Sequence, residues 1–167
     1  MQLGLDLSTF TTVHVVISLI GIAAGILAMF GLLGSNRMPG MTAIFLLFTI
    51  LTSATGFLFP FNGVTPGDVI GALSLVLLAI ACVALYAMQL AGAWRWIYVV
   101  TAMISLYLNV LVLVIQGFLK VPALHALAPG NPPNGPAFLI AQGIVLVFFV
   151  IVTIGAVRRF RPIMTYA

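Results

Sequence analysis

The chain has 167 residues, of which 63% are hydrophobic and only 5% are charged, with a formal net charge of +4. About 25% of the residues in a soluble domain are charged, so this composition excludes an ordinary soluble protein and predicts an integral membrane protein whose first partner is the lipid bilayer. The six basic residues are scattered along the chain, which argues against a nucleic-acid partner, because a phosphate backbone requires a basic patch.

Five apolar stretches without formal charge predict the fold class. Each has about 20 residues, the length that a helix needs to cross a hydrocarbon core about 30 Å thick. We therefore expect an all-α, polytopic transmembrane helical bundle that forms a single domain over residues 1–167. Glycine- and proline-rich breaks separate the stretches, and the expected spans are residues 12–33, 41–59, 69–91, 96–119 and 138–157.

The first two stretches carry small residues at helical spacing. Gly21 and Gly25 form a GxxxG element with Ala28 on the same face, a pattern typical of close helix contacts in membranes. Ser53 and Gly56 belong to a similar stripe in the second stretch, for which packing is again the favoured interpretation.

The third stretch begins with a helix-capping pattern. Thr65 is expected at the N-cap, and the carboxylate of Asp68 in the first turn is favoured by the helix dipole. Cys82 is the single cysteine, so no intramolecular disulfide forms, and we interpret it as a small buried hydrophobe.

The fourth stretch carries a polar stripe. Tyr98, Thr101, Ser105, Asn109 and Gln116 fall on one side of a helix with a turn of about 100° per residue. Two amides facing lipid would leave donors and acceptors unpaired, so the stripe is expected to face protein or water. Hydrogen bonding between helices is the favoured interpretation, and a polar path or ligand site is the alternative.

Charge predicts the orientation. With five spans, Arg37, Arg95 and the three arginines at 158, 159 and 161 share one face, whereas Lys120 and both carboxylates lie on the other. The positive-inside rule then places the N-terminus outside and the C-terminus in the cytoplasm.

In this orientation most of the strongest polar residues gather towards the outer leaflet. His125 lies in the proline-rich segment 120–136, which is expected to be a loop that covers this end. A ligand pocket there and simple contact with headgroups and water remain alternatives. The candidate ligand or polar-path residues are His14, Asp68, Asn109, Gln116, Lys120, His125 and Gln142.

No catalytic signature appears. Two histidines and one nearby carboxylate lack the spacing of a metal site, and no nucleophile motif is present. We therefore expect no catalytic residue, no metal and no cofactor, and an enzyme is the less favoured class.

Two segments resemble known proteins. The runs Thr52–Pro60 and Leu106–Pro122 look like parts of small five-span inner-membrane proteins of bacteria, a group to which no activity is attached. The resemblance covers most of the chain and implies a multi-pass protein of the bacterial inner (cytoplasmic) membrane, with no function carried over.

Three functional hypotheses follow. The favoured one is a non-enzymatic bundle that forms a homo-oligomer or joins other membrane subunits, because small residues line its first spans. The alternatives are a channel or carrier for a small neutral or amphipathic solute, and a protein that binds a quinone or lipid headgroup through His14 and Gln116.

Overall fold

The computed structural model describes residues 3–163. Within this range the chain is helical apart from its connections, and a turn of π-helix, η1, continues the third long helix. The elements are α1 (Leu7–Leu33), α2 (Pro39–Gly56), α3 (Pro66–Cys82), η1 (Val83–Ala87), α4 (Trp94–Lys120), α5 (Pro122–Leu127) and α6 (Pro136–Arg159).

The five expected spans correspond to α1, α2, α3 with η1, α4 and α6, so the predicted all-α bundle is confirmed. The predicted boundaries were wrong by several residues at some ends. The first helix begins at Leu7 rather than residue 12, because the Asp6 carboxylate accepts the Thr9 N–H and caps it. The second ends at Gly56 rather than residue 59, and the third is helical only to Ala87.

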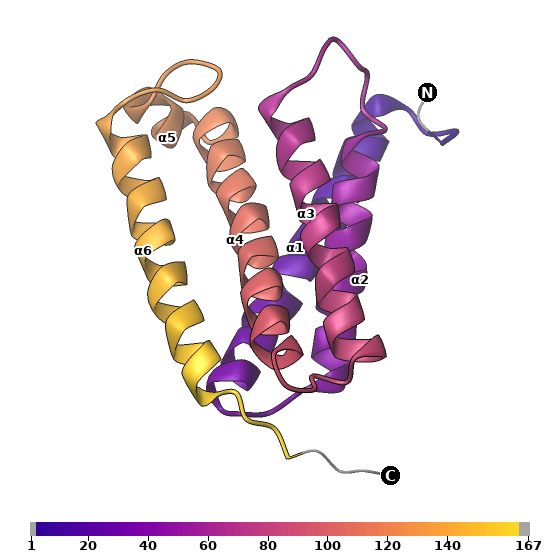
Figure 1. Ribbon diagram of the computed structural model, residues 1–167. Coiled ribbons are helices and arrows are strands. Elements are labelled where there is room, and N and C mark those ends of the chain that lie inside the picture. The colour runs from indigo at the N-terminus through magenta and orange to yellow at the C-terminus, as the bar shows by residue number, and fades with distance from the viewer. Residues whose placement is uncertain (1–2, 164–167) are drawn as a thin grey trace.

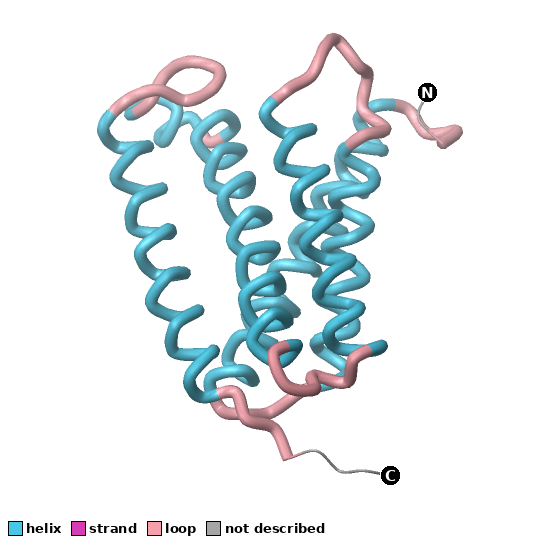
Figure 2. The backbone as a smooth tube through the Cα atoms, viewed as in Figure 1, coloured by secondary structure: helices cyan, strands magenta, loops and turns pink. Residues whose placement is uncertain are grey.

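The two termini lie at opposite ends of the bundle (Figure 1). We call the end that holds the N-terminus the N-side and the other end the C-side. The connections α2–α3 and α4–α6 close the N-side, and the connections α1–α2 and α3–α4 close the C-side (Figure 2).

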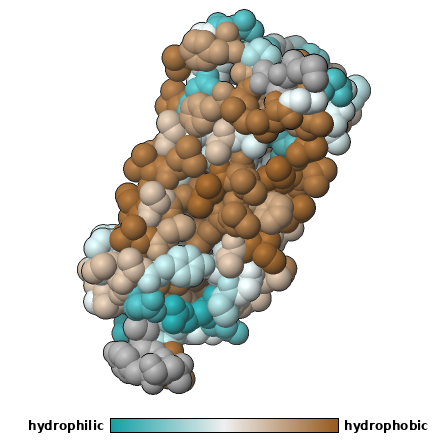
Figure 3. Space-filling model, turned by 90° about the vertical axis from the view of Figure 1, so that its right-hand side faces the viewer, coloured by the Kyte–Doolittle hydropathy of each residue, from teal (hydrophilic) through white to brown (hydrophobic). Residues whose placement is uncertain are grey.

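The surface has the pattern of a membrane protein. A broad hydrophobic belt separates hydrophilic residues at the two ends (Figure 3), and five helices are long and apolar enough to cross a bilayer. The helices satisfy their own backbone hydrogen bonds, as a hydrocarbon environment requires. The chain is a multi-pass membrane protein.

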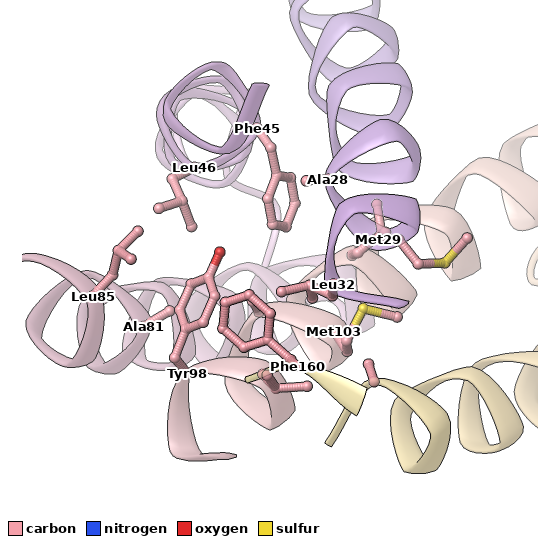
Figure 4. Close-up of a cluster of buried hydrophobic side chains, with 14 of the residues drawn as sticks. Ala28, Met29, Leu32, Phe45, Leu46, Ala81, Leu85, Tyr98, Met103 and Phe160 are labelled. Atoms are coloured by element: carbon pink, nitrogen blue, oxygen red, sulfur yellow. The ribbon is translucent and has the colours of Figure 1, made fainter. Parts of the chain in front are cut away.

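The hydrophobic core lies in the C-side half. Its buried members come from η1, from the second halves of α1, α3 and α6 and from the first halves of α2 and α4, together with Leu90 and Phe160 just outside the helices. Tyr98 and Phe160 stand at its centre with ring centroids 6.1 Å apart, and Leu32 and Leu85 pack around them (Figure 4). Side chains therefore fill this half of the bundle.

Helix α1 runs obliquely behind the others (Figure 1) and makes its closest contacts through glycines. A Cβ on Gly21 would stand 3.2 Å from Thr49 Oγ1 of α2, and one on Gly25 would stand 2.6 Å from a methyl of Leu106 in α4. Since only glycine leaves this space, the predicted GxxxG face serves contacts within the chain.

Helix α6 is the most peripheral span. Only Phe149 and Ala156 of α6 are buried, whereas ten residues of α4 are buried. Its C-terminal end is nevertheless held firmly, because Arg95 Nη1 donates to the carbonyl oxygens of Val157 and Phe160 at 2.9 and 2.6 Å. A cation at the end of a helix also opposes the negative pole of its dipole.

Candidate functional site

Polar side chains from α1, α2 and α4 meet in the N-side half. We call this group the polar seam and define it by the residues His14, Ser18, Thr49, Thr55 and Asn109. It has two hydrogen bonds between helices, from His14 Nδ1 to Thr55 Oγ1 at 2.8 Å and from Ser18 Oγ to Asn109 Oδ1 at 3.5 Å. The second bond is long, at the limit of the usual range.

The hydrogen-bond pattern defines the state of the His14 ring. Thr55 Oγ1 has one proton and donates it to the Leu51 carbonyl oxygen at 2.7 Å. The hydroxyl therefore accepts from His14, and Nδ1 carries the proton. In the neutral ring Nε2 is then an acceptor. The ring also packs edge-on against Phe59, with centroids 5.1 Å apart.

Two polar atoms of the seam are buried without a partner among residues 3–163. They are Asn109 Nδ2 and Thr49 Oγ1, and their residues are 8% and 1% exposed. An unpaired buried donor costs about 1–3 kcal/mol. The seam therefore retains unused hydrogen-bonding capacity at the depth of the bilayer core.

Buried hydroxyls on the C-side behave differently. Thr42 donates to the Arg37 carbonyl, Thr101 to Ile97 and Ser105 to Thr101, at 2.7–2.9 Å. Each of these hydroxyls finds its acceptor in the nearby backbone, so they stabilise local structure. In α1, α2 and α4, the buried side-chain atoms that lack a hydrogen-bond partner among the described residues thus lie in the N-side half.

The outer part of the α4 stripe lies at the surface. Asn109 is buried, whereas Gln116, nearer the N-side end of α4, is exposed. The helix continues to an exposed Lys120 at its N-side end. The exposed polar residues of α4 thus lie in its N-side turns, beyond the apolar residues 110–115 that follow Asn109.

The remaining candidates have local partners. Asp68 forms a capping box with Thr65, whose N–H and hydroxyl both donate to the carboxylate at 2.7 Å. His125 lies in α5, so the prediction of a loop there was wrong, and its Nδ1 donates to the Phe118 carbonyl at 3.2 Å. The predicted outer cluster is thus divided among separate places.

Gln142 lies on α6, away from the seam. Its Nε2 donates to the Leu111 carbonyl oxygen on α4 at 3.2 Å, and its Oε1 is buried without a partner among the described residues. Of the predicted packing residues on α2, Ser53 is buried, and a Cβ on Gly56 would stand 3.9 Å from His14 Cε1.

Sequence reasoning missed two features, of which only the second carries a recognisable signal. Arg95 was interpreted only as an orientation signal, and its partner at residue 160 has no sequence signature. Helix α5, by contrast, begins with Pro122 at its first position, a common helix start, and a capping analysis of the segment 120–136 would find it.

Within residues 3–163 no three metal-ligating side chains come together. Comparison with known proteins gives no relative, since no protein family, no curated protein and no solved structure matches the chain. The function is therefore inferred from the geometry of the seam and of α6.

Proposed function

We propose that the protein is a non-enzymatic membrane protein that binds an amphipathic molecule with a carbonyl-bearing head, such as a quinone or a lipid ester, at the polar seam. The observation that carries this proposal is the buried, unpaired amide N–H group of Asn109, whose Oδ1 accepts from Ser18, one turn of α1 from His14. A carbonyl oxygen is the acceptor that this donor lacks, and His14 Nε2 adds an acceptor for a hydroxyl on the same head.

The packing supports binding rather than conduction. The apolar core around Tyr98 and Phe160 fills the C-side half. A ligand that reaches Asn109 from the N-side therefore finds no passage onward to the C-side. A binding site with one entrance fits this arrangement better than a channel through a single chain.

Native mass spectrometry of the protein extracted gently in its own lipids tests the proposal, with an absorption spectrum of the same sample. We expect a retained small molecule whose occupancy falls in Asn109→Leu. The matched control is Thr101→Val, a buried polar residue on the same helix whose bond is to its own backbone. A wild-type protein without a bound molecule, or equal occupancy in Asn109→Leu, would contradict the proposal.

A second candidate is lateral self-association, favoured by the outer face of α6. A shallow depression surrounds Gly143 between Ile140, Ile144 and Val147, and a Cβ on Gly143 would meet nothing within 4 Å. Small residues on an exposed face let two membrane helices approach closely. Copies of the chain share one orientation in the bilayer, so a two-fold contact brings two such depressions together.

Counting subunits by single-molecule photobleaching in bilayers tests this candidate. The expected dimer fraction falls in Gly143→Ile and is unchanged in Ala23→Ile, the same kind of enlargement at an exposed position of α1. A monomeric wild-type protein at high surface density would exclude a second copy on this face.

For location, the proposal is the bacterial inner membrane with the N-side outside. The support is charge: Arg37, Arg95 and the arginines of the α6 end all lie near C-side connections. The positive-inside rule makes that side cytoplasmic.

A further inference from the structure

A groove of about 340 Å³ runs between α4 and α6, on the side of α4 opposite Asn109. Its lining includes Met103, Tyr107, Leu146, Phe149, Val150 and Thr153, which are apolar apart from one phenol and one hydroxyl. Tyr107 and Phe149 contact each other across it, with ring centroids 5.6 Å apart. The groove lies at the level of the bilayer core, because its residues occupy the middle turns of both spans.

Polar contacts join α4 and α6 at both ends of this groove. At the C-side end Arg95 caps α6 through Val157 and Phe160. At the N-side end, one helical turn beyond Tyr107 and Leu146, Gln142 donates to the Leu111 carbonyl oxygen. The two helices are thus connected above and below the groove.

Gln142 brings an unused acceptor to the N-side end. A carbonyl oxygen can only accept, so the amide must direct its N–H group towards Leu111 and keep Oε1 for another partner. That oxygen is buried without a partner among residues 3–163. A ligand that satisfies it must supply a hydrogen-bond donor.

The volume of the groove fits one hydrocarbon chain but not a helix. A methylene occupies about as much space as a water molecule, roughly 30 Å³, so the groove holds on the order of ten methylenes. A helix with its side chains is about 10 Å wide and does not fit a groove bounded by rings in contact.

The depth of Gln142 in the bilayer determines which polar headgroup the ligand can carry. Gln142 follows the start of α6 by six residues, which is about 9 Å at 1.5 Å per residue. Phe118 and Phe138 pack together at the N-side of it, with centroids 5.4 Å apart. A charged phosphate would lose its hydration there at high cost, whereas a hydroxyl needs only one acceptor.

We propose that the α4–α6 groove binds the hydrocarbon chain of a single-chain amphiphile whose neutral hydroxyl head donates a hydrogen bond to Gln142 Oε1. This site is separate from the polar seam, and it stands whether or not the seam binds a ligand. The polar group that recognises the ligand is Gln142, and the chain lies along Tyr107 and Val150 towards Thr153.

Photolabelling tests the site in the full-length protein. The probes are a long-chain primary alcohol with a mid-chain diazirine and its methyl ether, each in phosphatidylcholine liposomes, with labelled peptides mapped by mass spectrometry. We expect labelling of groove residues of α4 and α6, and a preference for the alcohol of about two- to tenfold, the factor that one hydrogen bond supplies.

Two pairs of proteins make the test specific. Val150→Trp fills the groove and should remove this labelling, whereas Val147→Trp places the same side chain on the outer face of α6 and should keep it. Gln142→Leu should label with alcohol and ether equally. The proposal fails if Val150→Trp labels like the wild type, if both faces of α6 label equally, or if Gln142→Leu retains the preference. A variant with a lowered melting temperature is replaced by Val150→Phe or Gln142→Met.

Discussion

Arg95 and Phe160, 65 residues apart in the chain, are joined by a hydrogen bond of 2.6 Å from the guanidinium Nη1 to the Phe160 carbonyl oxygen. The same nitrogen donates to Val157, and Phe160 itself is fully buried against Tyr98. One side chain at the start of α4 therefore fixes the end of α6.

Removing this contact should destabilise the bundle. For Arg95→Met we expect a loss of about 1.5–3 kcal/mol in the free energy of unfolding, the usual range for hydrogen bonds to a charged group. Unfolding by denaturing detergent in mixed micelles measures it. Arg158→Met is the control, since that arginine is exposed on the same end of α6, and equal losses in both variants would contradict the capping role.

The glycine contact between α1 and its neighbours should tolerate no enlargement. In Gly25→Ala the new Cβ would lie 2.6 Å from Leu106 and 2.8 Å from Phe45, so side chains must shift, and such overpacking costs about 1–3 kcal/mol. The same assay applied to Gly40→Ala, where nothing lies within 4 Å, should show no comparable loss. Wild-type stability in Gly25→Ala would mean that this contact is looser than described.

The cap of α1 should make stability depend on pH. Hydrogen bonds from Ser8 and Thr9 hold the pKa of the Asp6 carboxyl well below its usual range. A carboxyl with a lowered folded-state pKa stabilises the protein above its ordinary pKa of about 3.9, and this contribution is lost as the pH falls towards the lowered value. The stability difference between wild type and Asp6→Ala should therefore be full at neutral pH and shrink under acid conditions. A difference that does not change with pH would contradict this effect.

A closed C-side predicts no conduction by the single chain. Liposomes that contain the protein should shrink in an osmotic gradient at the rate of empty liposomes, for water and for small neutral solutes, in stopped-flow light scattering. Faster flux that disappears when both Asn109 and Gln116 are replaced by leucine would instead establish the channel hypothesis.

The proposed orientation predicts a simple labelling pattern. In a Cys82→Ala background, a cysteine at Asn62 in the α2–α3 connection should react with an impermeant maleimide added to intact cells. A cysteine at Asn36, in the α1–α2 connection, should react only after permeabilisation. The reverse labelling pattern would show that the N-side faces the cytoplasm. The polar seam would then lie in the inner leaflet.

Much of this fold follows from sequence because hydrocarbon imposes a strict rule on helix length and charge. The rule placed all five spans, but their ends depended on local caps such as Asp6, with which α1 begins five residues before the predicted position. The predicted stripe does not distinguish Asn109, which is buried, from Gln116, which lies seven residues further on and is exposed. The tilt of α1 relative to α4 decides whether a residue on that stripe is covered, and periodicity within one helix contains no information about tilt.

Partners between helices were the least predictable part. Nothing in the sequence pairs His14 with Thr55 or Gln142 with the Leu111 backbone, because such contacts depend on the order of helices in the bundle. The GxxxG element illustrates the same limit. Its spacing correctly indicates a close contact between helices, but the spacing does not say which helices are the partners, and these are α2 and α4 of the same chain.

The concentration of the apolar core in the C-side half has a consequence for internal motion. Segments with few buried apolar contacts open at a lower free energy than the rest of a protein, so the N-side turns of α1 and α4 should fluctuate while their C-side turns stay locked. Amide hydrogen exchange would then be graded along each helix, from Thr11 towards Leu32 in α1 and from Gln116 back towards Val99 in α4. A molecule that binds at the polar seam would then enter and leave through transient opening of the N-side end, while the C-side half keeps its packing.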